Sequence, residues 1–550
     1  MSTLRETSLP ASSLQGGSLQ EDTLHEPAAD LAPVLSERCI LTWRQAALCG
    51  LLGVLFLLVA YLPLSHHSVA KYSVWVHLAR GEAILNQGTL PTVDPVSSLS
   101  AGLAYVETSW LANTLLAWVA SVSLHHLALL VTVVTASTIL LLAGNAWHQT
   151  RNTAVVAGVA ILGLLGMSAD LTSAGPRMFA GLLFVLLLLA DNRRATSWMT
   201  WLATPLIVLL WANLDATTVG IPLLYLTLKA VGAAFDGWQS RETSLLPAKT
   251  TNERRGLTPP LGALFLAELA LLVTLATPLG ARLWWELLGQ LQTTASALAS
   301  GTTWIWASPA GVAMAALLLL AAVALRTSRL TLTATQLLPL AGLGLLALAQ
   351  PAAVLWCTPL ALLVLLPHLK SGLNIQADPA VDQSATSAEE AQRPLRFAYS
   401  MVAVLVVWTT FAFSPHSHFL LGNSPRTERQ LLDQQTPLGA VDYLRANPVD
   451  GLVWAPAPWG DFLQAKQGAA ASVYTGSAME NLPQQARFDY GKLLRGENGW
   501  ETIADRYDID CLVLDKRAQR AFVESTASPV EGWVVSYQDE KSLVLRRRDA

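Results

Sequence analysis

The sequence predicts a polytopic α-helical membrane protein with a soluble α/β domain at its C-terminus. Three observations support this fold class. The 550-residue chain is 52% hydrophobic and only 13% charged, a composition typical of membrane proteins. Its apolar residues form segments close to the roughly 20 residues that a helix needs to cross a hydrocarbon core about 30 Å thick. From residue 415 onward the composition changes to that of an ordinary soluble domain.

The N-terminal region predicts a short tail followed by a membrane anchor. Residues 1–41 are rich in Ser, Leu, Glu and Asp without periodicity, so we expect a disordered cytoplasmic N-terminus. The apolar segment 43–64 is long enough to span and has no small-residue cleavage site behind it, which favours a retained anchor over a signal peptide. The net charge of −4 does not indicate nucleic-acid binding, and the four cysteines predict no disulfide framework.

Twelve apolar segments are candidates for membrane spans, and together they predict a transmembrane domain over 42–414. They are 43–64, 109–122, 125–147, 152–169, 176–190, 198–214, 216–235, 259–277, 309–325, 333–349, 352–367 and 397–414. The positive-inside rule orients them, because Lys and Arg cluster in alternate loops from residue 193 onward. This orientation puts the N-terminus in the cytoplasm, and the first outer loop (65–108) and everything after 414 on the outer face. It requires an even number of crossings between 109 and 175, where three segments compete, so one of them, such as the short 109–122 or the glycine-rich 152–169, does not cross. We therefore expect about eleven transmembrane helices.

The C-terminal region 415–550 predicts a small outer α/β domain. Four short apolar runs at 451–455, 511–515, 533–537 and 542–546 have the pattern of strands. Helical patterns occupy 437–446, 497–506 and 516–525. The domain contains no glycine-rich phosphate loop and no cluster of metal ligands in its sequence.

Polar residues that interrupt the apolar segments collect at the predicted outer ends. Asp94 and Glu107 lie in the first outer loop, Arg177 opens a span, and Asp215 lies in an outer turn. A guanidinium can bind phosphate bidentately, and a carboxylate can take a proton from an acceptor hydroxyl. The alternative is that these are ordinary turn residues, with Asp94 shaping its loop and Asp215 pairing with Arg177.

The first outer loop carries motifs that extend this interpretation. "WVHLARG" (75–81), "PTVDPVS" (91–97) and "SWLA" (109–112) resemble, in order and spacing, the first outer loop of bacterial GT-C-type membrane glycosyltransferases, most of all a large uncharacterised subgroup. Later segments resemble the same subgroup: "GPRMFAGLL" (175–183), "WANLDATTVGIPLL" (211–224), "TPLG" (277–280), "WIWASP" (304–309), "PWGDFLQAK" (458–466) and "SVYTG" (472–476). The resemblance covers most of residues 40–550 and implies a GT-C-like fold.

The resemblance also implies roles for individual residues. Asp94 and Glu107 become candidates for the catalytic base, with Asp94 as a candidate contact for a divalent cation, Mg²⁺ or Mn²⁺. Arg177, Asp215, His77 and Trp75 become candidates for binding the donor. Several positions depart from the subgroup, where acidic or other polar residues are usual: Ser73, Ser109, Asp215, Thr277, Ile305 and Gln350.

These features leave three functions open. The first is a transferase of the bacterial cytoplasmic membrane that moves a sugar from a polyprenyl-phosphate donor to an envelope glycan or protein acceptor on the outer face. The second is a catalytically degenerate scaffold of the same fold that binds envelope glycans or partners, which the missing acids favour. The third is a transporter or flippase, suggested by Glu268 in the middle of a predicted span.

Overall fold

The computed structural model describes residues 74–100, 105–191, 198–243, 260–289, 306–376, 431–433, 436–467, 472–477, 479, 482–526 and 532–548. The predicted N-terminal tail, the predicted spans 43–64 and 397–414, Ser73, Ile305 and the predicted domain border at 414 lie outside the described residues.

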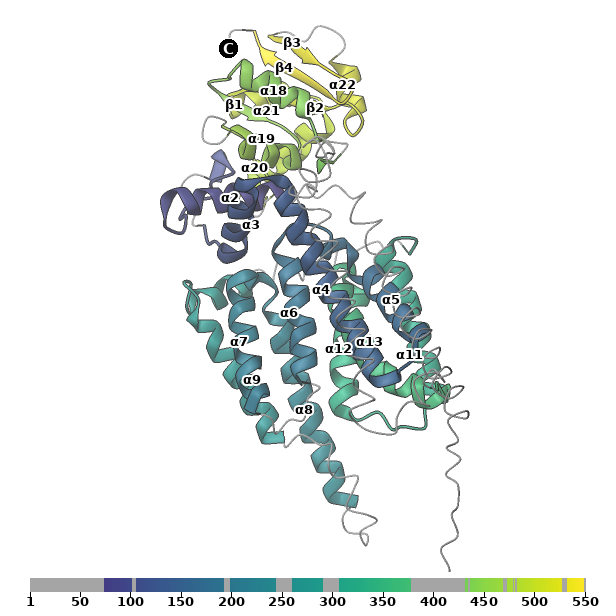
Figure 1. The fold of residues 1–550 in the computed structure, drawn as a ribbon. Coiled ribbons are helices and arrows are strands. Elements are labelled where there is room, and N and C mark those ends of the chain that lie inside the picture. The colour runs from purple at the N-terminus through teal and green to yellow at the C-terminus, as the bar shows by residue number, and fades with distance from the viewer. Residues whose placement is uncertain are drawn as a thin grey trace, which may run out of the picture.

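A bundle of apolar helices forms the larger part of the molecule (Figure 1). Its helices are α4 (Leu124–Thr150), α5 (Thr153–Leu171), α6 (Pro176–Asp191), α7 (Trp198–Leu214), α8 (Gly220–Thr243), α9 (Pro260–Val273), α11 (Pro309–Thr327), α12 (Ala334–Ala349) and α13 (Val354–Gly372). Helix α13 is central, because it packs against α4, α5, α6, α11 and α12 and nearly all of its side chains are buried. The bundle therefore matches the predicted apolar segments closely in both position and type.

Five helical segments in the described part of the chain are long and apolar enough to cross a membrane: 124–150, 154–171, 216–239, 309–327 and 351–372. The chain is thus a membrane protein by composition and helix length, while the count of about eleven spans stays a prediction. Helix α3 (Trp110–Val122) has only 13 residues, about 20 Å at the usual rise per residue. Of the two candidates for the segment that does not cross, α3 is therefore the better one, since α5 is long enough.

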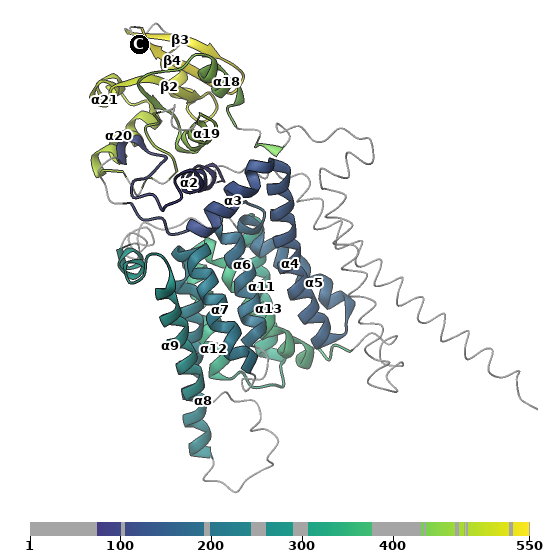
Figure 2. The same ribbon diagram turned by 60° about the vertical axis from the view of Figure 1, so that its left-hand side comes forward.

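The first outer loop lies across one end of this bundle (Figure 2). It contains α2 (Val74–Gln87), the turn around Asp94, and a short 3-10 helix, Ser98–Ser100. Apolar residues of α2 are buried on two sides, because the helix packs against α3 and against α19 (Ala457–Gln467) of the C-terminal domain. Helix α2 is thus held between two parts of the protein.

The described residues from 431 onward form the sheet domain, whose four-stranded sheet has the order β1-β2-β4-β3. The strands are β1 (Leu452–Trp454), β2 (Ile509–Asp515), β3 (Trp533–Gln538) and β4 (Ser542–Arg547), with β1 parallel to β2 and the other pairs antiparallel. Its helices are α18 (Leu438–Ala446), α19 (Ala457–Gln467), α20 (Gln484–Arg495), α21 (Trp500–Arg506) and α22 (Arg520–Ser525). All four predicted strands are confirmed.

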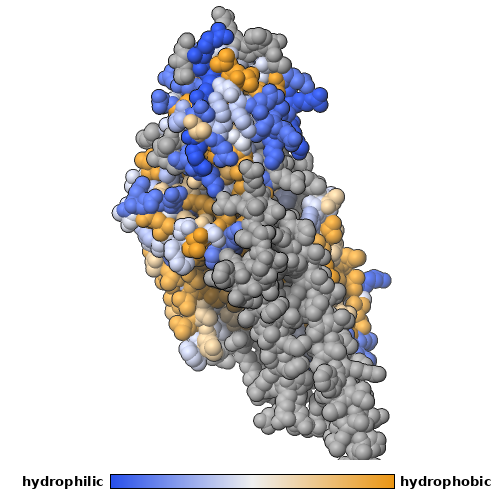
Figure 3. All heavy atoms as spheres, turned by 45° about the horizontal axis from the view of Figure 1, so that its top comes forward, coloured by the Kyte–Doolittle hydropathy of each residue, from blue (hydrophilic) through white to orange (hydrophobic). Residues whose placement is uncertain are grey.

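Specific contacts join the sheet domain to the first outer loop. The rings of Trp75 on α2 and Phe462 on α19 meet edge to face with centroids 4.7 Å apart, and Lys466 lies over the same Trp75 ring. The backbone N–H of Ser98 donates to the carbonyl of Val473 at 3.1 Å. On the face seen in Figure 3, hydrophilic residues gather over the sheet domain and hydrophobic ones over the bundle below it. The loop therefore lies between a more hydrophilic domain and a more hydrophobic bundle.

Candidate functional site

Three of the predicted site residues, His77, Glu107 and Arg177, lie in the region where α2, α3 and the start of α6 meet beneath the sheet domain. We call His77, Glu107, Asn113, Gly175 and Arg177 the loop site. Helix α2 supplies His77, the turn before α3 supplies Glu107, α3 supplies Asn113, and the turn into α6 supplies Gly175 and Arg177. These residues are separated by up to 100 positions in the sequence, so only the fold brings them together.

Glu107 anchors the loop site through three hydrogen bonds. The hydroxyl of Tyr105 donates to Oε2 at 2.6 Å, while the backbone N–H of Ser109 and Nδ2 of Asn113 donate to Oε1 at 2.9 and 3.0 Å. The residue is only 2% exposed. Burial, reinforced by the Glu107 charge, raises the pKa of the Tyr105 phenol well above its usual value, so that phenol remains a donor. Glu107 thus uses both carboxylate oxygens inside the protein.

The side-chain amide of Asn113 connects Glu107 to His77 by hydrogen bonds. Because its amide nitrogen donates to Glu107, its Oδ1 faces His77 Nδ1 at 2.9 Å. A side-chain amide oxygen only accepts hydrogen bonds, so Nδ1 of His77 must carry the proton. The neutral imidazole is therefore fixed in one tautomer, in which Nε2 has a free lone pair.

The surroundings of His77 keep this imidazole neutral. Burial by its dense neighbours and the positive charges of Arg80 and Arg177 lower its pKa to about 4, against a smaller opposing effect of the Asn113 hydrogen bond. The His77 side chain nevertheless retains some solvent-exposed surface. At neutral pH, His77 thus offers an uncharged hydrogen-bond acceptor next to a partly open surface.

Arg177 borders the same imidazole. A methyl group placed on Gly175 would lie 3.6 Å from His77 Cδ2 and 3.7 Å from Nε2, so the turn into α6 runs along this edge of the ring. Arg177 ion-pairs with Asp170 at 3.6 Å and its side chain remains 50% exposed. The N-terminus of α6 adds partial positive charge at this point. The guanidinium is therefore accessible to an anion beside His77.

Asp215 has different partners from those considered in the sequence. It is 1% exposed and accepts hydrogen bonds from the hydroxyls of Thr217 and Thr218 at 2.5 and 2.7 Å. Arg177 ion-pairs with Asp170, and among the described residues no ion pair joins it to Asp215, the partner considered from the sequence. The next residue, Ala216, donates its N–H to the carbonyl of Thr108, which ties this turn to the turn that carries Glu107.

Asp94 lies in a separate buried charge cluster at the junction with the sheet domain. It is 4% exposed, ion-pairs with Arg80 at 3.2 Å, and accepts the N–H of Val96 at 3.1 Å. Asp461 of α19 interacts electrostatically with both Arg80 and Asp94. It accepts hydrogen bonds from the backbone N–H and the hydroxyl of Ser477. Burial raises the pKa of Asp461 to about 7. Asp94, Arg80 and Asp461 thus join the loop to the sheet domain.

The geometry around Asp94 does not fit a divalent cation. Its oxygens face a guanidinium and a backbone N–H, both of which repel a cation. No group of three His, Cys, Asp or Glu side chains that could hold a metal occurs among the residues with a described position. Mg²⁺ and Mn²⁺ prefer several oxygen ligands, so the surroundings of Asp94 suit neither ion.

The structure adds three residues that were not among the candidates from the sequence, Arg80, Asn113 and Asp461, and it gives the motif residue Gly81 a packing role. Arg80 and Gly81 stand within "WVHLARG", and Asp461 stands within "PWGDFLQAK". Asn113 follows the Trp-Leu pair that opens α3. For Asn113 the available signal was a polar residue within an otherwise apolar helix, whereas α2 and α19 contain several polar residues and offered no such contrast. Trp75, expected near substrate, contacts Phe462 of the sheet domain.

Comparisons with known proteins complete this description. No protein-family model matches the chain, and no curated protein is significantly similar to it. Structures of the oligosaccharyltransferase from Archaeoglobus fulgidus are similar at 12% identity over 92% of this chain and 74% of that chain. The apo form has a TM-score of 0.47. The form tethered to an acceptor peptide, and the complex of AglB with an inhibitory peptide and a dolichol-phosphate, both have a TM-score of 0.45. At this level of similarity, the function of this chain has to be argued from its own residues.

Proposed function

We propose that the protein is a GT-C-type glycosyltransferase of the bacterial cytoplasmic membrane, with its N-terminus in the cytoplasm and its sheet domain on the outer face. It would transfer a sugar from a polyprenyl-phosphate donor to an envelope glycan or protein acceptor. The resemblance of the loop motifs supports this proposal. The observation that carries it is the chain of hydrogen bonds from Glu107 through Asn113 to His77, which presents a neutral Nε2 beside the accessible guanidinium of Arg177.

In this proposal Arg177 binds the donor phosphate and His77 receives the proton. The oxygen of an acceptor hydroxyl attacks the anomeric carbon of the sugar, and the bond from that carbon to the phosphate oxygen breaks. The hydroxyl proton moves to Nε2 of His77, and the polyprenyl phosphate leaves with its negative charge opposite Arg177. An anionic donor would also offset the Arg177 charge that lowers the pKa of His77, which would make the imidazole a better base once the donor is bound.

The carboxylates act indirectly in this scheme. Glu107 is a positioning residue, because its contacts fix the amide of Asn113 and hence the tautomer of His77. Asp94 is a positioning residue too, since its ion pair with Arg80 holds the turn of the loop against α2, next to Asp461 of the sheet domain. The direct catalytic roles expected for these two residues from the sequence are thus replaced, in the proposal, by His77. The sheet domain, which covers the loop, would help to select the acceptor.

The test uses the full chain in detergent with polyprenyl-phosphate-linked hexoses and pentoses, supplied one at a time. We expect His77→Gln to lower transfer by about 100-fold or more, because a general base contributes on that scale, while leaving undecaprenyl-phosphate binding intact. Arg177→Ala should weaken that binding, measured by native mass spectrometry. His148→Gln, at an exposed position at the other end of α4, is the matched control. Unchanged transfer by the His77 variant would refute the site.

A second candidate is the catalytically degenerate scaffold, a protein that binds a lipid-linked phosphate without turning it over. Asp94, Glu107 and Asp215 favour it, since all three carboxylates are buried and bonded within the protein. Undecaprenyl-phosphate binding that depends on Arg177, together with no product from any donor tested, would decide for it.

The transporter alternative gains no support from Glu268. This carboxylate is exposed on the surface of α9, on the same helix as the exposed residues Phe265 and Leu272. A group that couples proton movement to transport would instead be expected to face the interior of the bundle or a water-filled cavity.

A further inference from the structure

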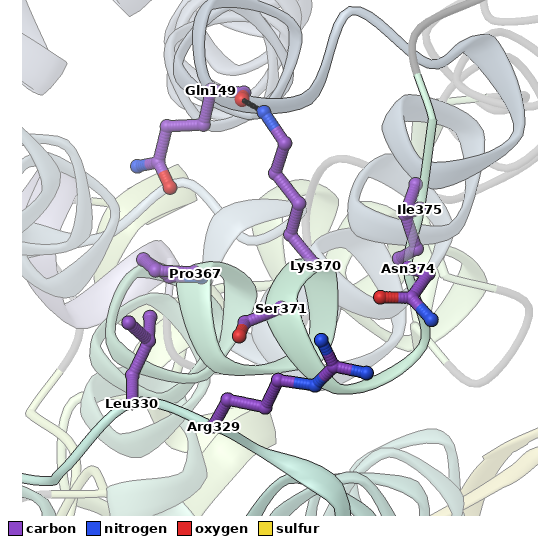
Figure 4. A pocket seen from close by; sticks show the side chains of 8 residues that line it. All are labelled: Gln149, Arg329, Leu330, Pro367, Lys370, Ser371, Asn374 and Ile375. Atoms are coloured by element: carbon purple, nitrogen blue, oxygen red, sulfur yellow. Dashed lines mark hydrogen bonds between the residues drawn. The ribbon is translucent and has the colours of Figure 1, made fainter.

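A pocket of about 560 Å³ opens at the end of the bundle opposite the sheet domain. It lies where α4 and α13 end and where the chain passes from α11 to α12. Its polar lining comes from Gln149, Arg329, Lys370, Ser371 and Asn374, which Figure 4 shows arranged around one space. The loop site lies at the other end of the bundle, so this pocket belongs to neither the donor site nor the sheet-domain junction.

The described residues that line the pocket carry two positive charges and no carboxylate. Arg329 is exposed, and its guanidinium makes no hydrogen bond or ion pair with the part of the chain that the structure describes. Lys370 donates one hydrogen bond to the carbonyl of Gln149 at 2.6 Å, which stabilises the C-terminus of α4 and leaves two further N–H groups on its ammonium. The local electrostatics therefore favour an anion.

A second, independent feature points to a ligand. Oε1 of Gln149 is buried and has no hydrogen-bond partner among the described residues. A buried acceptor of this kind costs on the order of 1–3 kcal/mol unless a donor reaches it. A ligand that places a hydroxyl near Gln149 and an anionic group near Arg329 and Lys370 would satisfy the acceptor and both cations.

The position of the pocket limits what this ligand can be. Three apolar helices, α4, α11 and α13, end around it, which places it at the boundary between hydrocarbon and water. Leu330, Pro367 and Ile375 complete the lining with apolar surface beside the polar groups. Basic pockets between membrane helices at this depth suit the head groups of anionic lipids.

We propose that this pocket binds the phosphodiester head group of an anionic phospholipid with a hydroxyl-bearing head group, as phosphatidylglycerol has. Arg329 and Lys370 contact the phosphate, Gln149 accepts a hydrogen bond from a head-group hydroxyl, and the apolar residues contact the glycerol backbone and the start of the acyl chains. The site is independent of the proposed transferase activity.

The experiment measures lipid retention by the purified full chain with native mass spectrometry. The protein is exposed to equimolar phosphatidylglycerol and phosphatidylcholine, and we expect the former to be retained preferentially. Arg329→Gln should reduce this preference by about tenfold, since a charge-assisted phosphate contact is lost. Arg326→Gln is the matched control, because it removes the same charge near the end of α11 from a residue that does not line the pocket.

Three outcomes would overturn the proposal. One is equal retention of the two lipids, and another is an equal effect of the Arg329 and Arg326 substitutions. The third is protection against thermal unfolding by inorganic phosphate without retention of phosphatidylglycerol, which would assign the pocket to a soluble phosphate. Gln149→Leu tests the hydroxyl contact separately. If this contact forms, the wild type retains phosphatidylglycerol better than phosphatidic acid, which lacks head-group hydroxyls. Gln149→Leu should narrow this difference in retention, and an unchanged difference would contradict the contact.

Discussion

Gly81 on α2 allows the close approach of α2 to α3 that the loop site requires. A methyl group at this position would overlap the backbone carbonyl oxygen of Asn113 and lie 2.5 Å from its carbonyl carbon and 2.7 Å from the methyl of Ala117. Ordinary van der Waals contact begins at 3.4 Å, so Gly81→Ala requires the two helices to separate by at least about 1 Å. The hydrogen bond between His77 and Asn113, now 2.9 Å long, would then reach about 4 Å and break.

The cost of this substitution follows from two opposing effects. Overpacking typically destabilises by about 1–3 kcal/mol, while replacing a helical glycine by alanine recovers about 0.5–1 kcal/mol. We therefore expect a net loss of up to about 2.5 kcal/mol, and an apparent Tm several degrees lower in detergent. Adding Ala117→Gly should not rescue the variant, because the carbonyl of Asn113 is part of the backbone and remains in place.

Two measurements check this prediction. The first is thermal unfolding of the full chain, with Gly158→Ala on α5 as the control, because a methyl group there meets nothing within 4 Å. The second is the ¹⁵N NMR signal of the neutral Nδ1–H tautomer of His77, assigned through His77→Gln, which should change to that of a mixture of tautomers. A Gly81 variant that unfolds with the control and retains the tautomer signal would refute the packing argument.

Four further predictions concern charge and packing around the same loop. Burial raises the pKa of Asp461 to about 7, so the protonated carboxyl contributes to the free energy of unfolding below pH 4, and this contribution is lost as the pH rises to 7. Asp461→Asn should abolish this pH dependence of stability, which amounts to up to about 4 kcal/mol. The pKa of His77 is lowered to about 4, so the neutral imidazole contributes to stability above pH 6.5, and this contribution is lost as the pH falls to 4. His77→Gln should abolish this loss of stability in acid. Glu107→Ala leaves three donors without an acceptor and should lower the free energy of unfolding by on the order of 3 kcal/mol. Glu107→Gln should lower it by less than about 2 kcal/mol and retain the His77 tautomer. Trp75→Ala removes the ring that contacts Phe462 and should cost about 3 kcal/mol at the domain junction, seen as faster proteolysis of the sheet domain.

Each of these predictions has an outcome that contradicts it. The first two fail if thermal unfolding of the Asp461 or His77 variant depends on pH as the wild type does between pH 4 and 8. Equal losses of stability in the two Glu107 variants would show that the hydrogen-bond count does not set the cost. Wild-type proteolysis of the Trp75 variant would show that its ring contact does not hold the domain.

Local patterns predicted the secondary structure because each helix and strand is encoded by its own periodicity. The four strands of the sheet domain and the helices from 124 to 372 follow segments whose apolar residues repeat with the expected spacing. The partners of the charged residues were not predictable in this way. Asp94 meets Arg80 across a turn and lies near Asp461, which is more than 360 residues away, and such pairing depends on how α2 packs against α19.

The same limit applies to the loop site. The sequence identified His77 and Glu107 as candidates, but it contained no sign that Asn113 connects them, because the link depends on the close approach of two helices at Gly81. The motifs, by contrast, did indicate where the site lies in the sequence. Residues of "WVHLARG" contact α3, α19 and the turn into α6.

Helix α2 supplies Trp75 to the sheet domain, His77 to the loop site, Arg80 to the charge cluster and Gly81 to the contact with α3. Four separate requirements thus fall within seven consecutive residues. A change that suits one of them shifts a helix on which the other three depend, so few substitutions in this stretch can be neutral. In a library of variants selected only for membrane insertion, this stretch should accept many replacements. In one selected for activity, it should be among the least tolerant parts of the chain.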